Sequence, residues 1–251
     1  MEYSLQEVAC PRCDQTLSIQ SRFCRHCGLS IHGSDPVAGQ NRTVTLLIIF
    51  YVLELIICGL VTFNESFKGF QALCIADTIM AVVAIFFFTL IWKDVKGLLS
   101  WQNFSIKKAL VYIGITILFS TVVQLSVSWL NKSLFNDEFY YYFAFARFKY
   151  PLVLMISVIA LMPAIFEELA YRGFLMGGLL KLLDARQAIF ISSFLFALIH
   201  LSLISFFWLL PFALFLAYIR QKENTIWYGV LVHFVFNTLT CLIEYYSLFA
   251  S

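Results

Sequence analysis

Long apolar runs are the feature that most limits what this chain can fold into. A helix needs about 20 residues to cross a bilayer, and seven runs approach or exceed that length. Because the bilayer interior offers the backbone no hydrogen-bond partners, such segments must be helical. We therefore predict an all-α, polytopic transmembrane bundle. The predicted spans are 44–63, 70–92, 109–130, 151–180, 188–203, 204–219 and 226–249.

The composition supports this fold class. Of the 251 residues, 61% are hydrophobic and 13% are charged, with a mean hydropathy of +0.84. A soluble domain is usually about 45–50% apolar and about 25% charged, so a soluble enzyme is excluded. The aromatic segment 139–148 is expected to lie in the membrane interface, or to add an eighth span. The first 43 residues are polar, and we expect no cleavable signal peptide there.

Four cysteines interrupt the polar N-terminal region in two C-x-x-C pairs, Cys10 with Cys13 and Cys24 with Cys27. Two such pairs can place four thiolates tetrahedrally around one zinc ion. Disulfides are the rival interpretation, but thiols facing the cytosol would be reduced. We predict a structural zinc ribbon over 1–32, too small to fold without its metal, and a polar linker over 33–43. A protein partner for the ribbon is open; its arginines form no dense basic patch, so nucleic acid is not expected.

The distribution of Lys and Arg predicts how the bundle lies in the membrane, because these residues are enriched in cytosolic loops. A cytosolic N-terminus places twelve of them on the inner side and four outside, with Arg172 left out because it lies within a span. The inner set is Arg12, Arg22, Arg25, Arg42, Lys93, Lys96, Lys107, Lys108, Lys181, Arg186, Arg220 and Lys222, and the outer set is Lys68, Lys132, Arg147 and Lys149. We therefore expect an integral protein of a bacterial inner membrane with a cytosolic ribbon.

Three charged side chains lie together inside the span 151–180. Each costs roughly 2.5–3.5 kcal/mol at the bilayer centre on insertion scales, so each needs a partner or a purpose. Glu168 and Arg172 are four residues apart and can pair on one helix face. Glu167 lies about 100° around the helix from Glu168 and can point elsewhere. Local pairing therefore accounts for two of the three charges, and Glu167 is a candidate for chemistry.

Two later spans carry further polar side chains. His200 lies in one of them, and His233 and Asn237 lie four residues apart in the other, on one helix face. At a rise of about 1.5 Å per residue, all of them and Glu167 lie about 12–21 Å from the inner loops. Three helices therefore carry polar groups at overlapping depths, which allows them to converge. Such residues are rare in spans without a function.

A carboxylate with two imidazoles and an amide matches the needs of peptide hydrolysis. Glu167 could take a proton from water, and His200 could orient that water. His233 and Asn237 could donate hydrogen bonds to an oxyanion. Alternatively, Glu167, His200 and His233 could bind a catalytic divalent metal such as Zn²⁺, with one position left for water.

The patterns Glu167-Glu168-x-x-x-Arg172, Phe196-x-x-x-His200 and His233-x-x-x-Asn237, on successive spans, resemble the CAAX protease and bacteriocin-processing family (CPBP, or Abi) of intramembrane proteases. The resemblance covers 109–251 and leaves 44–108 outside it, as two further helices and a cytosolic loop.

The resemblance implies a helical fold with a cavity open to the cytosol, in which Glu167 and His200 activate water and His233 and Asn237 stabilise the oxyanion. Glu168 and Arg172 would orient the site. Members have been described both as metalloproteases and as glutamate-dependent enzymes, and either fits these residues. The substrate would be a membrane-associated peptide or protein. A ribbon of this kind is typical of bacteria, so a prenylated substrate is not expected.

Two other function classes use the same residues. A non-catalytic scaffold or bacteriocin-immunity protein could retain the fold and bind a partner through its ribbon. A proton- or metal-coupled transporter could use the same buried carboxylate and imidazoles, although no inverted repeat is evident. Glu54, Asp77 and Glu244 also lie in predicted spans, and the sequence assigns them no role.

Overall fold

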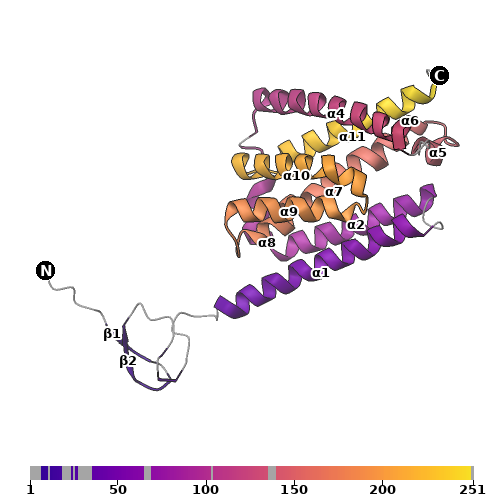
Figure 1. Ribbon diagram of the computed structural model, residues 1–251. Helices are drawn as coiled ribbons and strands as arrows, with labels where there is room; N and C mark the ends of the chain where they lie inside the picture. The colour runs from indigo at the N-terminus through magenta and orange to yellow at the C-terminus, as the bar shows by residue number, and fades with distance from the viewer. Residues whose placement is uncertain are drawn as a thin grey trace. The chain divides into compact units, whose positions relative to one another are not determined.

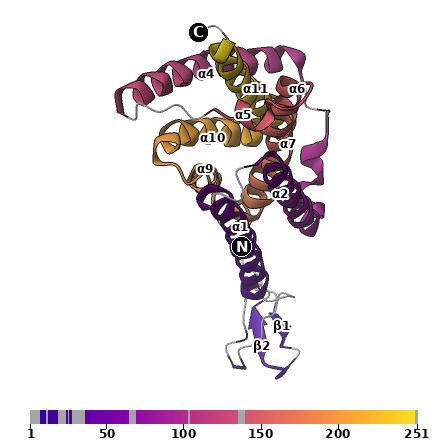
Figure 2. The same cartoon turned by 90° about the vertical axis from the view of Figure 1, so that its right-hand side faces the viewer.

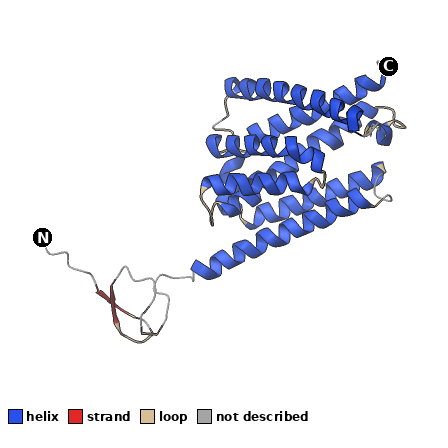
Figure 3. Ribbon diagram, in the orientation of Figure 1, coloured by secondary structure: helices blue, strands red, loops and turns tan. Residues whose placement is uncertain are grey.

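The computed structural model describes residues 7–10, 12–18, 24, 26–27, 36–64, 69–102, 104–134 and 140–249. The chain divides into two compact units, Met1–Leu46 and Leu47–Ser251. The first unit holds a small hairpin and the four cysteines, and the second is a bundle of helices (Figure 3). Each unit is described by itself.

The hairpin pairs β1 (Glu7–Ala9) with β2 (Thr16–Ser18) in antiparallel register, so that Val8 lies opposite Leu17. The chain between the strands carries Cys10 and Cys13. Leu17, Cys10 and Cys24 are buried against each other. This core is very small, which is typical of a fold that depends on a metal ion.

The bundle begins with α1 (Pro36–Phe63), α2 (Phe70–Leu90), α3 (Trp92–Val95) and the 3₁₀ turn η2 (Lys96–Leu99). Residues 36–43 therefore form the first turns of a helix, although the sequence analysis placed them in the linker. Proline is favoured at the first position of a helix, where its missing N–H costs nothing, and Pro36 occupies that position. Residues 33–35 of the expected linker, and Lys68 of the predicted outer set, lie outside the described residues.

The next helix is α4 (Ile106–Leu134), followed by α5 (Tyr142–Phe145). At four residues α5 is too short to cross a membrane, so the described part of 139–148 adds no eighth span. A continuous helical rod then runs through α6 (Pro151–Met155), the π-helical η3 (Ile156–Leu161), α7 (Met162–Glu167), the π-helical η4 (Glu168–Leu175) and α8 (Met176–Leu179). π-Helical stretches are rare and are frequently found at functional sites.

Three helices complete the bundle: α9 (Ala185–Ile199), α10 (Leu203–Glu223) and α11 (Trp227–Phe249). Asp184 caps α9 by accepting hydrogen bonds from the backbone N–H groups of Arg186 and Gln187. Leu201 ends that helix in a left-handed conformation with φ 53°. Asn224 does the same at the end of α10, with φ 50°.

The rod lies at the centre of the bundle (Figures 1 and 2). α2 packs against α7 and η4 on one side, while α9 and α10 pack against η4 on another. α11 covers η3 and α7, and α4 packs along α11. Seven of the eight residues of η4 are buried, Glu168 and Arg172 among them. The core of the bundle therefore surrounds the charged segment.

The helices confirm the predicted fold class. Within the described residues, six helices are long and apolar enough to cross a membrane, and they correspond to six of the seven predicted spans. The predicted span 188–203 corresponds to α9, which has 15 residues. It would extend about 22 Å, less than the roughly 30 Å of a hydrocarbon core. Its cap at Asp184 and its turn at Leu201 fix that length.

Three of the loops predicted on the inner side meet at one end of the bundle. Thr225 donates to the carbonyl oxygens of Leu98 and Ser100, and Lys181 forms an ion pair with Asp94. The helix end predicted at 219 was wrong, because α10 continues to Glu223 and includes Arg220 and Lys222, which were counted as loop cations. Arg220 is 6% exposed and donates from Nε to the backbone oxygen of Arg172 at 3.0 Å. Its long side chain thereby braces η4.

Candidate active site

The central feature of the site is a buried ion pair on η4. Arg172 Nη1 lies 3.0 Å from Glu168 Oε1, and both residues are at most 1% exposed. This confirms the pairing that the spacing predicts. Arg172 also donates from Nη2 to the backbone oxygen of Ala213 at 3.3 Å, and its guanidinium stacks on the Phe196 ring. A charge removed from water needs such partners, so the pair is held in one orientation.

His233 lies between the two adjacent glutamates. Its Nδ1 is 3.2 Å from Glu168 Oε1, and its Nε2 is 3.8 Å from Glu167 Oε2. The imidazole is buried between the rings of Phe196 and Phe212. The carboxylate of Glu168 can only accept when it is ionised, which makes Nδ1 of His233 the donor. The bond to Glu168 therefore fixes the tautomer and the direction of the ring.

Gly229 leaves the space in which Glu168 lies. A methyl group at Gly229 would come 2.5 Å from Glu168 Oε2. Gly229 is two residues into α11, one turn before His233, so α11 approaches the glutamate closely at this point. Gly229 could not be identified from the sequence, because a single glycine in an apolar helix carries no signal of what faces it.

Glu167 points away from the ion pair, as its place on the helix predicts. Its side chain is 19% exposed, and its Oε2 is buried without a hydrogen-bond donor from the described residues. Glu167 also lines a cavity of about 50 Å³, together with Glu54 and Asp77. The sequence analysis left Glu54 and Asp77 without a role, because neither has a motif and both lie far from Glu167 in the sequence.

His200 lies at the C-terminal end of α9. Its Nδ1 is 2.9 Å from the backbone oxygen of Phe196, and its ring is edge-on to the Phe196 ring. A carbonyl oxygen can only accept, so Nδ1 carries the proton, and Nε2 of the neutral ring has a free lone pair. His200 is exposed, whereas His233 is buried. Phe196 contacts both imidazoles, so the structure brings the two histidines to one aromatic ring.

Asn237 forms a hydrogen bond with the helix backbone one turn before Pro163. Its Nδ2 donates to the backbone oxygen of Ile159 at 3.1 Å. In a regular helix that oxygen would accept from the residue four positions on, which is Pro163, and proline has no N–H. Asn237 therefore donates to a carbonyl that cannot accept from Pro163. An amide nitrogen has two protons, so one of them remains for another acceptor.

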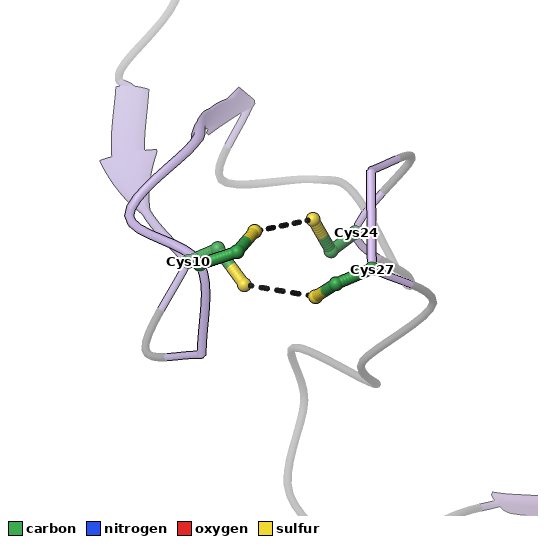
Figure 4. A group of neighbouring side chains, drawn as sticks. Cys10, Cys24 and Cys27 are labelled. Atoms are coloured by element: carbon green, nitrogen blue, oxygen red, sulfur yellow. Dashed lines mark hydrogen bonds between the residues drawn. The ribbon is translucent and has the colours of Figure 1, made fainter.

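The four cysteines form a group suited to a metal ion. All four sulfurs lie within 4.8 Å of one another, with 3.6 Å between Cys10 and Cys27 and between Cys13 and Cys24 (Figure 4). A tetrahedral zinc ion with bonds of about 2.3 Å places its sulfurs about 3.8 Å apart, so the arrangement fits zinc. A hydrogen bond from the backbone N–H of Cys27, followed by one from His26, lowers the pKa of the Cys24 thiol to about 6.

The thiols are free cysteines in this arrangement, not disulfides. Among the described residues, these four cysteines are the group of three or more potential metal ligands whose donor atoms all lie within 4.8 Å of one another. Glu167, His200 and His233 do not reach that spacing in the orientations seen here.

Comparison with protein families shows what each unit resembles. A model described as type II CAAX prenyl endopeptidase Rce1-like matches residues 149–239 of the bundle. A zinc-ribbon domain model matches residues 6–31, so the N-terminal unit is a zinc ribbon. Comparison with curated proteins and with solved structures found no significant match.

The resemblance stated from the motifs is therefore confirmed for both units. The Rce1-like match contains all seven named residues of the three motifs, from Glu167 to Asn237. It begins after α1 and α2, which carry Glu54 and Asp77. The family supports an intramembrane endopeptidase in general, and with six apolar helices the chain is an integral membrane protein.

Proposed function

We propose that this chain hydrolyses a peptide bond of a membrane-associated protein or peptide, with Glu167 as general base. The observation that carries the proposal is the environment of Glu167. One of its oxygens faces His233 Nε2 at 3.8 Å, lacks a donor from the described residues and lies beside a cavity. Glu168, one residue away, has its charge neutralised by Arg172. Among the described residues, no lysine or arginine pairs with Glu167 in this way, so Glu167 is available to take and give a proton.

In the proposed reaction, Glu167 removes one proton from water while the water oxygen attacks the carbonyl carbon of the scissile bond. The carbonyl oxygen becomes the oxyanion of a tetrahedral intermediate. When this collapses, the C–N bond breaks and Glu167 returns the proton to the leaving nitrogen. The products are a carboxylic acid, which keeps the second proton of the water, and an amine, and the carboxylate of Glu167 is regenerated.

His200 is proposed to orient the attacking water. The bond from its Nδ1 to the Phe196 carbonyl leaves the lone pair on Nε2, so the ring can accept a hydrogen bond from water. Its exposure, in contrast to the burial of His233, suits a group that meets a substrate entering between the helices.

His233 and Asn237 are proposed to stabilise the oxyanion. The second proton on Asn237 Nδ2 is available for this, since the first goes to Ile159. His233 can donate from Nε2 when it is an imidazolium ion, because Nδ1 already donates to Glu168. A positive charge on His233 would also balance those of Glu167, Glu168 and Arg172 to zero. Donors fixed in advance in this way stabilise a transition state at little reorganisation cost.

The orientation of the chain in the membrane is part of the proposal. Three cation-bearing loops cluster at one end of the bundle, which supports a cytosolic location for that end. We propose that the N-terminus lies on the same side, in a bacterial inner membrane. Zinc in the ribbon would then be held by thiolates in a reducing compartment. We propose a protein as the partner of the ribbon.

The test is a comparison of the protein termini in membranes that contain the wild-type chain or Glu167→Gln. Glutamine keeps the size of the side chain but cannot act as a base. We expect a set of new N-termini with the wild type that disappears with Glu167→Gln. Glu244→Gln is the matched control, because Glu244 accepts from the Tyr142 backbone in another part of the bundle. Equal sets of termini for all three chains would favour a scaffold, and loss of cleavage on chelation in a ribbon-deleted chain would favour a catalytic metal.

A further inference from the structure

The cavity beside Glu167 is lined by three carboxylates from three different helices. Glu54 belongs to α1, Asp77 to α2 and Glu167 to α7, and the cavity has a volume of about 50 Å³. The rest of its lining is apolar or small, and includes Met80 and Met162. α1 and α2 lie outside the segment 149–239 that matches the Rce1-like family. Two of the three carboxylates therefore lie outside the segment that matches the family.

Two oxygens at this cavity are buried without a donor. Glu54 is 1% exposed, and its Oε1 receives no hydrogen bond from the residues that the structure describes. Glu167 Oε2 likewise receives no hydrogen bond from the described residues. Buried polar atoms in folded proteins are almost always satisfied, either by protein groups or by water. Both atoms therefore call for a donor that the surrounding side chains do not supply.

We propose that this cavity holds water within the membrane and supplies the water that Glu167 activates. A water molecule needs about 10–15 Å³ of such space and two to four polar partners, so the volume suits about three to five molecules. Three carboxylates provide up to six acceptor oxygens. A hydrolase consumes one water molecule per cycle, so a polar cavity beside its general base can hold the water that the next cycle uses.

Water fits this cavity better than a metal ion does. Among the described residues, the donor atoms of the four cysteines all lie within 4.8 Å of one another, whereas those of the three carboxylates do not. Hydrogen-bonded water can bridge groups that are farther apart than ligands of one ion. The apolar part of the lining, with its two methionines, also contributes no ligand that a hard cation prefers.

The hydration of the cavity can be tested without any substrate. Brief radiolysis of the purified chain in nanodiscs produces hydroxyl radicals from bound water, and these oxidise the nearest methionines. We expect oxidation of Met80 and Met162 to fall at least threefold in Glu54→Leu, which removes the acceptor and keeps an apolar side chain. Glu54→Gln retains a hydrogen-bonding group and should restore the wild-type rate. Glu244→Gln, away from the cavity, is the control and should leave both methionines unchanged.

Asp77→Leu provides a second variant if Glu54→Leu fails to fold, and it should lower the same two oxidation rates. Unchanged oxidation of Met80 and Met162 in a folded apolar variant would overturn the proposal. Met155 is completely buried and does not line the cavity, so its oxidation should be the same in every variant. A change at Met155 would mean a general loosening of the fold, and would overturn the interpretation as well.

The proposal that the cavity supplies water to Glu167 rests on the proposed function, and testing it requires the rate of peptide cleavage. With a peptide that spans a mapped cleavage site, we expect Glu54→Leu to lower kcat about tenfold with KM within twofold, and Glu54→Gln to restore kcat. Normal kcat together with a lost oxidation signal would overturn the supply role. If the wild type cleaves nothing while the oxidation pattern holds, the proposed function fails and the hydrated cavity remains.

Discussion

Gly229→Ala is a single added methyl group that should displace Glu168. The new Cβ would lie 2.5 Å from Glu168 Oε2 and 3.2 Å from its Cδ. Ordinary contacts between heavy atoms are about 3.5–4.0 Å, so the carboxylate must move by roughly 1 Å. Glu168 is held by Arg172 at 3.0 Å and by His233 at 3.2 Å. A displacement of this size breaks at least one of these bonds.

The magnitude follows from these contacts. Overpacking a core position costs about 1–3 kcal/mol, and alanine in a helix returns about 0.5–1 kcal/mol relative to glycine. We therefore expect a modest loss of thermal stability. The effect on the reaction should be larger, because a misplacement of about 1 Å at a site can lower the rate about 100-fold. We expect kcat to fall between 10-fold and 100-fold.

The assay measures kcat for a mapped peptide in proteoliposomes, with melting temperature measured in parallel. Gly178→Ala is the control, because its Cβ would come 2.7 Å from Leu47 Cδ2, away from Glu168. It should lose similar stability and keep the wild-type kcat. A wild-type kcat in Gly229→Ala would refute the reasoning that the position of Glu168 matters. Equal loss of kcat in both variants would refute it too, since overpacking alone would then explain the effect.

Three further predictions test other parts of the structure. Arg172→Met should cost about 3–5 kcal/mol in thermal unfolding, because it leaves Glu168 buried and uncompensated; the double variant with Glu168→Gln should recover much of this, and no recovery would contradict the pair. Cys24→Ser should remove one zinc ion per chain by metal analysis, and an unchanged zinc content would contradict the four-thiolate site. Alkaline phosphatase, which is active outside the cytosol, should be active when fused after Lys149 and inactive when fused after Lys96; the reverse pattern would contradict a cytosolic N-terminus.

The helical fold follows from the sequence because bilayer physics leaves few alternatives. Apolar runs, the two C-x-x-C pairs and the spacing of Glu168 and Arg172 each have a physical meaning that does not depend on distant residues. The length of α9 was overestimated, because hydropathy does not register the cap at Asp184 or the left-handed turn at Leu201. The apolar composition continues past the ends of α9, but the helical backbone stops there.

Contacts between residues far apart in the chain could not be predicted from the sequence. Glu54 and Asp77 lie beside Glu167 because α1 and α2 fold against the central rod, and nothing local indicates this. The misplacement of Arg220 has a related cause, since its neighbours Gln221 and Lys222 resemble a loop end whereas its side chain turns inward to the Arg172 carbonyl. The bond between Asn237 and Ile159 joins two helices, so its link to Pro163 becomes visible once the fold is known.

The most direct test of the account is the rate of peptide cleavage by purified Glu167→Gln in proteoliposomes, beside the wild type and Glu244→Gln. General base catalysis contributes about 10²–10⁴ in rate. The account predicts a loss of at least about 100-fold in kcat for Glu167→Gln, with melting temperature and KM close to those of the wild type. Cleavage by Glu167→Gln at the rate of Glu244→Gln would contradict the assignment of Glu167 as the base.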